Sequence, residues 1–224
     1  SVTTRHMSEY ISLDAEVGFI DFDQLLTMVS ELLGCMVDYA WEHAKDELEL
    51  LGAVKPKLKE ELPRLTMAEI HDLYSKATGE NTRDELDLLP AEERWVCEYA
   101  AKELGSEAVF VTDWPARDAK FYHKIDDERP EIAVRADLLF RGVEVVTTSM
   151  REHHYDKLVA QLKKMAKGDP DSEGFRNFLM AFKYGMPPHG GFGMGLERVT
   201  QELIGLGNVK EATLFPRDTK RLAP

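Results

Sequence analysis

The sequence predicts an α+β fold in which helices flank a largely antiparallel sheet, and three observations support this class. Segments with an apolar period of three to four are mixed with short segments of period two, without strict βαβ alternation. Residues 131–148 contain two such short segments joined at Arg141-Gly142, which is typical of a hairpin. The 224 residues are 43% hydrophobic and 31% charged, which suits a globular protein with one substantial core or two modest ones.

Local signals place the boundaries of the elements. Asp21 or Asp23 can cap the first helix, Thr66 and Glu69 form a capping box, and glycines follow several apolar stripes. The predicted elements are a strand within 8–20, a helix from 21 or 23 to about 51, a surface connection over 53–65, a helix over 66–76, a polar loop over 78–89, a helix over 90–104, a strand over 108–112, two strands within 131–148, and helices over 156–167, 172–183 and 196–204.

Charge and composition restrict the classes of function. The chain has 28 Lys and Arg against 41 Asp and Glu, a net charge of −13, so any contact with RNA must be local. No apolar run is long enough to span a membrane and no signal peptide is visible, so we expect a cytoplasmic protein with no membrane partner. Cys35 and Cys97 are predicted to be small buried side chains of a reducing compartment. The adjacent His153 and His154 resemble a metal pair but lack an H-E-x-x-H spacing, so they are predicted to lie at a helix start.

Two carboxylates flank the predicted hairpin turn. If Phe140 pairs with Val143, then Asp137 faces Val146 and lies diagonally from Glu144 on the same face of the sheet. Like charges there repel unless a cation lies between them, and Mg²⁺ prefers such oxygen ligands with phosphates completing its shell. The alternative is a solvated sheet face that carries two acids.

A glycine-rich run precedes the last helix. Gly191, Gly193 and Gly195 share one face if the segment is extended, which lets a flat group approach the backbone closely. The helix that begins at Leu196 directs its N-terminal dipole the same way, and Arg198 in its first turn can bind a phosphate or stack on a purine. The run is neither G-x-G-x-x-G nor a P-loop, and the alternative is a structural turn.

A third group lies on the first strand. Tyr10, Ser12, Asp14 and Glu16 share strand parity, so an adenine could stack on Tyr10 and an ammonium group could meet Asp14. Arg151 offers a planar fork to a carboxylate or a phosphate. The alternative for the first group is an edge strand with a solvent-exposed face, and the alternative for Arg151 is a surface salt bridge.

Three separated stretches resemble the class II aminoacyl-tRNA synthetases, and within that class the aspartyl enzymes of the archaeal and eukaryotic type. TTRHMSEYISLDAEVGF (3–19) resembles the second half of their motif 2, and RADLLFRGVEVVTTSMREHHYDKL (135–158) resembles their acidic strand pair with its arginine. The ending from residue 185 onward resembles motif 3 and the C-terminus. The resemblance implies the class II antiparallel sheet flanked by helices. Motif 1, the start of motif 2 and the anticodon-binding domain have no match, so residues 1–224 are expected to be the C-terminal part of such a catalytic domain.

The resemblance also implies the roles of individual residues. ATP-binding positions are expected at Arg5, His6, Met7, Tyr10, Glu144, Gly195, Leu196, Glu197 and Arg198. Aspartate-binding positions are expected at Asp14, Thr147 and Arg151, and the ligands of Mg²⁺ are expected at Asp137, Glu144 and Thr147. Arg198 and Glu144 are the expected catalytic residues.

The implied activity is that of an aspartate–tRNA ligase, which forms aspartyl-adenylate from ATP and L-aspartate and transfers aspartate to the 3′ end of tRNA. A homodimer is expected at full length, with weak or no activity for this fragment alone. The family usually has small residues and a glutamine where this chain has Val146, Thr148, Ser149 and Met150. The stretch Ser149-Met150-Arg151-Glu152 is slightly more similar to the asparaginyl relatives than to the aspartyl ones. Two alternatives remain: a paralogue that activates aspartate for a small acceptor, resembling an asparagine synthetase, and a non-catalytic ATP-binding module.

Overall fold

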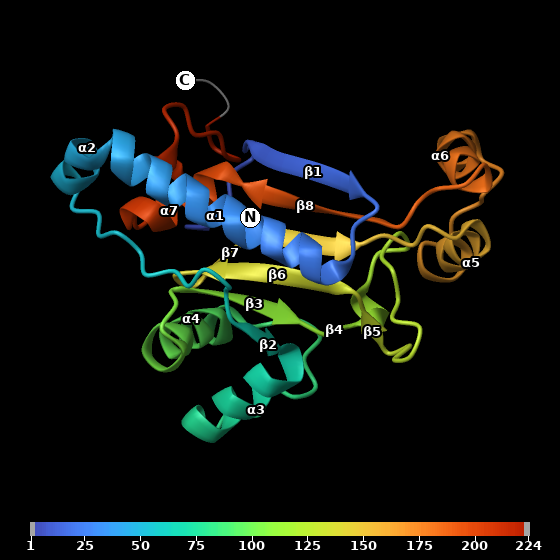
Figure 1. Ribbon diagram of the computed structural model, residues 1–224, viewed down its shortest axis with the longest axis horizontal. Coiled ribbons are helices and arrows are strands. Elements are labelled where there is room, and N and C mark those ends of the chain that lie inside the picture. Colours follow the sequence, from blue (N-terminus) through green and yellow to red (C-terminus); the bar gives the residue numbers. More distant parts are fainter. Residues whose placement is uncertain (1–2, 222–224) are drawn as a thin grey trace.

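Six strands form one sheet in the computed structural model, which describes residues 3–221 (Figure 1). Their order is β1-β8-β7-β6-β3-β2, and every neighbouring pair is antiparallel except the parallel pair of β2 and β3. The strands are β1 (Ser12–Gly18), β2 (Arg64–Thr66), β3 (Ala108–Thr112), β6 (Arg135–Phe140), β7 (Val143–Met150) and β8 (His189–Gly195), while β4 (Trp114–Pro115) and β5 (Ile132–Ala133) form a separate pair. This arrangement confirms the predicted α+β class. The outer ends of the predicted unit 1–224, residues 1–2 and 222–224, lie outside the described residues.

Helices surround this sheet. They are α1 (Phe22–His43), α2 (Lys45–Leu50), α3 (Met67–Thr78), α4 (Pro90–Tyr99), α5 (Tyr155–Met165), α6 (Glu173–Lys183) and α7 (Leu196–Ile204), with a π-helical turn at Ala100–Leu104 and 3₁₀ turns at Ala116–Asp118 and Val209–Ala212. Thr66 caps α3 in the predicted capping box, and Asp21, one of the two predicted caps of α1, also forms a capping box, with Gln24. No helix in the range 3–221 has the length and apolar character needed to cross a membrane.

The core lies on both faces of the sheet. On one face, Leu26 and Val29 of α1 belong to the same buried cluster as Phe140 and Met194 of the sheet. On the other face α3 and α4 cover β3 and β6, where Val96 is fully buried (Figure 1). Burying one such side chain contributes about 1.5–3 kcal/mol. Because side chains alternate along a strand, every second residue of β1 and β8 points away from α1, toward a face that α3 and α4 do not reach.

The prediction of one continuous helix to about Leu51 is wrong. Ala44 has φ −134° and ψ 32°, outside the helical region, and it separates α1 from α2. The surface connection predicted over 53–65 ends in β2, and Arg64 pairs there with Phe110 of β3. A strand of three residues is too short to leave a recognisable alternation in the sequence.

The prediction that both cysteines are buried is right for Cys97 and wrong for Cys35. Cys97 is buried on α4, and this burial raises the pKa of its thiol to about 12. Cys35 is exposed on α1, because it points away from the stripe that carries the buried Leu33 and Val37. Both cysteines are free thiols.

The register of the hairpin differs from the predicted one beyond its turn. Phe140 pairs with Val143 as predicted, but a β-bulge shifts the pairing between Leu138 and Leu139. As a result Asp137 pairs with Thr147, and the predicted pairing of Asp137 with Val146 is wrong. The extra residue on β7 brings Thr147 to the face that carries Glu144.

Candidate active site

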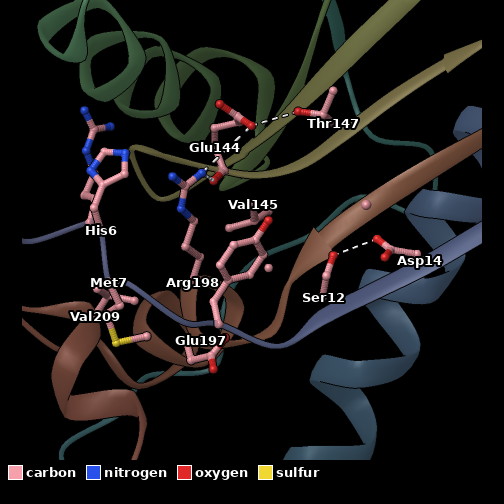
Figure 2. A pocket seen from close by; sticks show the side chains of 14 residues that line it. His6, Met7, Ser12, Asp14, Glu144, Val145, Thr147, Glu197, Arg198 and Val209 are labelled. Atoms are coloured by element: carbon pink, nitrogen blue, oxygen red, sulfur yellow. Dashed lines mark hydrogen bonds and ion pairs between the residues drawn. The ribbon is translucent and has the colours of Figure 1, made fainter. Parts of the chain in front are cut away.

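A cavity of about 560 Å³ opens on the face of the sheet that points away from α1 (Figure 2). Its walls come from the segment before β1, from β1 itself, from β7 and β8, and from the first turn of α7. Most of the predicted site residues line it, namely Arg5, His6, Met7, Tyr10, Asp14, Glu144, Thr147, Gly195, Glu197 and Arg198. The three sequence stretches that were considered separately therefore meet at one site.

Arg198 and Glu144 are in direct contact inside this cavity. Nη1 of Arg198 donates to the main-chain oxygen of Glu144 at 2.7 Å and lies 3.8 Å from its side-chain Oε1 (Figure 2). Gly195 is the N-cap residue of α7, so Arg198 lies in the first turn of that helix, and this turn positions its guanidinium. The cavity thus contains a guanidinium and a carboxylate near a helix N-terminus, where an anion is stabilised.

The bulge of β7 gives Glu144 a second neighbour. Oγ1 of Thr147 donates to Oε1 of Glu144 at 2.8 Å. Asp137 lies beneath this pair, only 3% exposed and outside the cavity lining, and its Oδ2 accepts a hydrogen bond from Arg135 at 2.8 Å. Burial raises the pKa of Asp137 to about 7, against the lowering effect of Arg135. Only Glu144 among the predicted metal ligands therefore presents a carboxylate to the cavity.

β1 and the segment just before it present a carboxylate and an aromatic ring to the cavity. Tyr10 is 66% exposed, which leaves its ring free to stack against a ligand. Oγ of Ser12 donates to Oδ1 of Asp14 at 2.6 Å, and Asp14 lies opposite Gly193 of β8. Glu197 also has a structural role. Its carboxylate accepts a hydrogen bond from the backbone N–H of Ile11 at 3.0 Å, which fixes the start of β1 to α7.

The segment before β1 carries a second guanidinium and an imidazole. Arg5 forms an ion pair with Glu93 of α4, and His6 forms a hydrogen bond with Thr3. Burial, followed by the positive charge of Arg198, lowers the pKa of His6. Burial raises the pKa of Glu93 despite the hydrogen bond from Arg5.

Arg151 and Leu196 lie outside the cavity lining. Nη2 of Arg151 donates to Oε1 of Glu16 at 2.6 Å, and its Nη1 donates to Oγ of Ser149. Its guanidinium also lies over the ring of Tyr122, 5.3 Å from the centroid. This side chain, predicted to receive the amino-acid carboxylate, is therefore already paired with a carboxylate of the chain.

Four lining residues were not among the predicted site positions: Ser12, Val145, Gly193 and Val209. Strand parity and the alternating glycines had singled out Ser12 and Gly193 without assigning them a role. Val145 lies at the bulge, and Val209 comes from the turn after α7, so no local pattern marks either of them.

The sequence of this chain matches a family of known proteins over almost its whole length. The family model for class II tRNA synthetases (D, K and N) matches residues 1–219. The chain is 44% identical over 223 residues to the aspartate–tRNA(Asp/Asn) ligase of Thermus thermophilus, covering 99% of this chain and 51% of that protein. It is 37% identical to the aspartate–tRNA(Asp) ligase of Pyrococcus furiosus, covering 99% and 50%. The chain thus spans about half the length of the curated relatives it matches.

Solved structures agree with these sequence matches. An aspartyl-tRNA synthetase from Entamoeba histolytica superposes with a TM-score of 0.92 at 27% identity, covering all of this chain and 46% of that one. The asparaginyl-tRNA synthetase from Pyrococcus horikoshii complexed with asparaginyl-adenylate gives a TM-score of 0.88 at 31% identity, covering 100% and 51%. These matches confirm the predicted resemblance.

Proposed function

This chain belongs to the class II tRNA synthetases of the D, K and N group, and from that premise we propose that it forms the C-terminal part of the catalytic domain of an aspartate–tRNA ligase. In this proposal residues 1–224 contribute most of the site that activates L-aspartate with ATP. The observation that carries the proposal is the contact of Arg198 with Glu144 inside a cavity that also exposes Tyr10. A phosphate-binding cation, a metal-binding carboxylate and an adenine platform are the groups that an ATP site needs.

ATP binds with its adenine between Tyr10 and Arg198 in this proposal. The phosphates lie toward Arg5, His6 and the N-terminus of α7, where positive charge and helix dipole stabilise them. Gly195 of β8 supports this placement, since a Cβ there would lie 3.7 Å from Cδ of Arg198, beside the position proposed for the ring. Met7 and Glu197 complete the wall.

Aspartate binds with its ammonium group at Asp14 and its side-chain carboxylate at Arg151, beside Thr147. A guanidinium gains a bidentate, charge-assisted pair with a carboxylate and gains less with a neutral amide, which selects aspartate over asparagine. Arg151 would exchange its contact with Glu16 for one with the substrate, and the 55% exposure of the Glu16 side chain makes that exchange feasible.

The Glu144 carboxylate, with Asp137 buried near it, fits a hard divalent cation. Glu144 presents its carboxylate to the cavity, and the buried Oδ1 of Asp137 has no hydrogen-bond partner within the described part of the chain. Glu144 would hold Mg²⁺ with Asp137 beside it, while Thr147 orients Glu144. When bound, the ion neutralises phosphate charge as the reaction proceeds.

The reaction is an attack by an α-carboxylate oxygen of aspartate on the α-phosphorus of ATP. The bond from that phosphorus to the bridging oxygen breaks and pyrophosphate leaves. The 3′-terminal hydroxyl of tRNA then attacks the carbonyl carbon, AMP leaves, and the hydroxyl proton passes to solvent. Positioning and charge neutralisation by Arg5 and Arg198 suffice, without a nucleophilic side chain. The net charge of −13 favours local tRNA contacts over bulk attraction, and we place the full-length enzyme in the cytoplasm as a homodimer.

ATP–pyrophosphate exchange with the full-length protein tests the proposal. We expect exchange that depends on aspartate and Mg²⁺, reduced about 100- to 1,000-fold in Arg198→Ala. Arg83→Ala is the matched control, since Arg83 is exposed, pairs with Asp72 and is not part of the lining of this cavity. Undiminished exchange in Arg198→Ala would overturn the mechanism.

The same assay separates the alternative functions. Exchange together with charging of tRNA supports the ligase. Exchange without charging supports a paralogue that transfers aspartate to a small acceptor, and binding of Mg²⁺-ATP without exchange supports a non-catalytic module.

A second substrate is favoured by one specific contact. Glu16 already neutralises Arg151, and Ser149 also bonds to it, an environment that suits a neutral amide as well as a carboxylate. Asparagine is therefore the second candidate for activation, and exchange measured with asparagine in place of aspartate tests it directly.

A further inference from the structure

Three consecutive residues between β7 and α5 form a cluster of possible metal ligands outside the cavity described above. Glu152, His153 and His154 each offer one ligand atom, and these atoms all lie within 4.8 Å of one another. The rings of His153 and His154 have centroids only 4.0 Å apart, although adjacent side chains in an extended chain normally point to opposite sides. His154 is the N-cap residue of α5, which agrees with the predicted position of the pair at a helix start.

The carboxylate of this cluster lacks a permanent cation. Glu152 is only 2% exposed, and its Oε1 accepts the backbone N–H of His154 and faces Nδ1 of the same residue, both at 2.9 Å. Among residues 3–221 neither Lys nor Arg forms an ion pair with Glu152. A buried carboxylate without a cation is costly, and a bound divalent ion would offset that cost.

The two imidazoles are suited to metal binding. Each ring offers a ligand nitrogen, and the 4.0 Å separation of the two ring centroids lets both nitrogens reach one ion. For one ion to bind both Glu152 and His154, the ligand atom of His154 must be Nδ1, which lies 2.9 Å from Oε1 of Glu152, and the proton of that ring must be on Nε2.

We propose that Glu152, His153 and His154 bind one divalent transition-metal ion of the Zn²⁺ class. Two imidazole nitrogens with a carboxylate oxygen are the ligand types that Zn²⁺ takes, whereas Mg²⁺ requires oxygen ligands. This site therefore differs in ion preference from the Glu144 site, and it does not depend on the proposed ligase activity. It lies directly after Arg151, so an ion bound there fixes the chain on one side of that residue.

Cobalt titration of the tag-free full-length protein, stripped of metal with a chelator, tests this site. Tetrahedral Co²⁺ bound to imidazole gives visible absorption bands, and we expect them to saturate with one ion per chain, to disappear on addition of Zn²⁺ and to persist in excess Mg²⁺. His153→Ala and His154→Ala should each weaken Co²⁺ binding by at least about tenfold. His43→Ala is the matched control, because His43 is exposed at the end of α1 and should leave the titration unchanged.

Folding defects are separated from ligand loss in two ways. Far-ultraviolet circular dichroism of each variant reports whether it is folded, and His154 is the preferred position because its side chain is 56% exposed. In the unsubstituted protein, one equivalent of Zn²⁺ should shift the histidine ring resonances in the NMR spectrum for His153 and His154 and leave those of His43 in place. Absence of stoichiometric Co²⁺ or Zn²⁺ uptake, unchanged uptake in a folded His153→Ala/His154→Ala variant, or displacement by Mg²⁺ would overturn the proposal.

Discussion

Asp14 lies directly opposite Gly193 in the β1–β8 ladder, and a Cβ atom at Gly193 would lie 2.9 Å from Oδ1 of Asp14. Because that oxygen ends a side chain, Gly193→Ala should displace the Asp14 carboxylate and leave the backbone in place. Under the proposed function we expect the KM for the amino acid to rise about tenfold, equivalent to ~1.4 kcal/mol. Aspartate-dependent exchange kinetics measure this effect.

Two neighbouring substitutions serve as controls for Gly193→Ala. A Cβ at Gly191 would overlap the Glu16 carboxyl group and the main-chain oxygen of Ala15, so Gly191→Ala should destabilise the fold itself. Gly34 in α1 has open space around it, and Gly34→Ala should stabilise the protein by about 0.5–1 kcal/mol. Urea unfolding distinguishes the three variants, and a Gly193→Ala protein as unstable as Gly191→Ala would contradict this interpretation.

The ion pair of Arg151 with Glu16 predicts a change in substrate preference. Glu16→Gln removes the charge that competes with a substrate carboxylate for Arg151, and the pair is partly exposed, so the gain is limited. We expect the ratio of kcat/KM for aspartate over asparagine to rise up to about fivefold, the equivalent of ~1 kcal/mol. Glu9→Gln is the control, because Glu9 pairs with Arg217 instead. An unchanged ratio would show that Glu16 does not influence selection.

Local parts of the site could be predicted from the sequence. The helix after Leu196 was predicted with its end at Gly205, which has φ 83°, whereas the glycine run from Gly191 was considered extended only as a condition and forms the strand β8. These features depend on conformations within a few residues, which spacing reports directly. The same reasoning placed Tyr10 and Asp14 on one face of a strand; both line the cavity, although β1 begins only at Ser12.

The contacts that complete the site could not be predicted, because they join distant segments. Arg5 meets Glu93 across 88 residues, and Arg151 meets Glu16 across 135 residues. The bulge in β7 also escaped prediction, since one extra residue leaves the hydrophobic pattern readable but shifts every later pairing. Packing of the whole sheet, which no local spacing reports, determines these positions.

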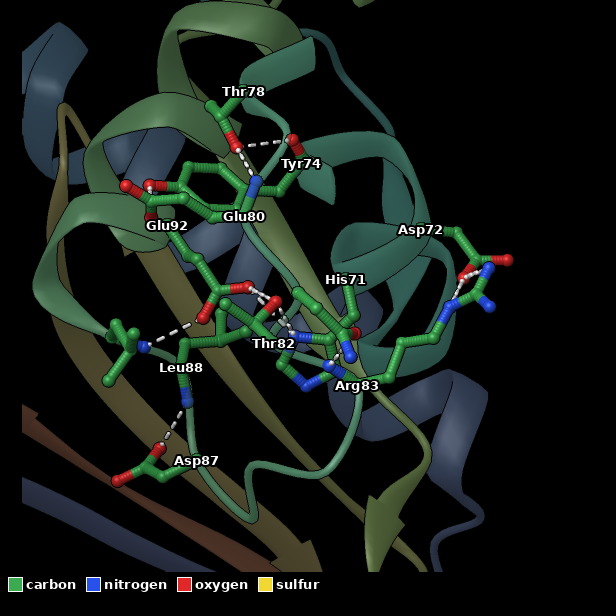
Figure 3. A network of polar contacts seen from close by, with 12 residues as sticks. His71, Asp72, Tyr74, Thr78, Glu80, Thr82, Arg83, Asp87, Leu88 and Glu92 are labelled. Atoms are coloured by element: carbon green, nitrogen blue, oxygen red, sulfur yellow. Dashed lines mark hydrogen bonds and ion pairs between the residues drawn. The ribbon is translucent and has the colours of Figure 1, made fainter. Parts of the chain in front are cut away.

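A buried polar network predicts a large effect on stability (Figure 3). Glu92 of α4 has no exposed surface; its Oε1 accepts from Oγ1 of Thr82 at 2.6 Å and lies 2.8 Å from Nδ1 of His71, and its Oε2 accepts the backbone N–H of Leu89. Glu92→Ala leaves these donors unpaired, so we expect a loss of about 3–5 kcal/mol in the free energy of unfolding. Urea unfolding measures this loss.

Glu98, which is exposed on the same helix, provides the comparison. Glu98→Ala removes a carboxylate from α4 without opening the interior, and its effect should stay within about 0.5 kcal/mol. Equal urea midpoints for Glu92→Ala and Glu98→Ala would show that the network does not stabilise the loop over 79–89.

Glu202 on α7 predicts a pH-dependent effect on stability. Burial raises the pKa of its carboxyl group from 4.5 to about 7, despite the opposing charges of Arg141 and Arg5. Between these two values the folded chain keeps a proton that the unfolded chain has released, so the stability contributed by this group is present below pH 4.5 and is lost as the pH rises through 7. Glu202→Gln cannot lose that proton, and its urea midpoint relative to the unsubstituted protein should therefore rise between pH 5 and pH 8. Glu211 is exposed, so the midpoint of Glu211→Gln should show no such trend. If the midpoint of Glu202→Gln instead falls relative to the unsubstituted protein between pH 5 and pH 8, the fold stabilises the Glu202 carboxylate and the prediction is wrong.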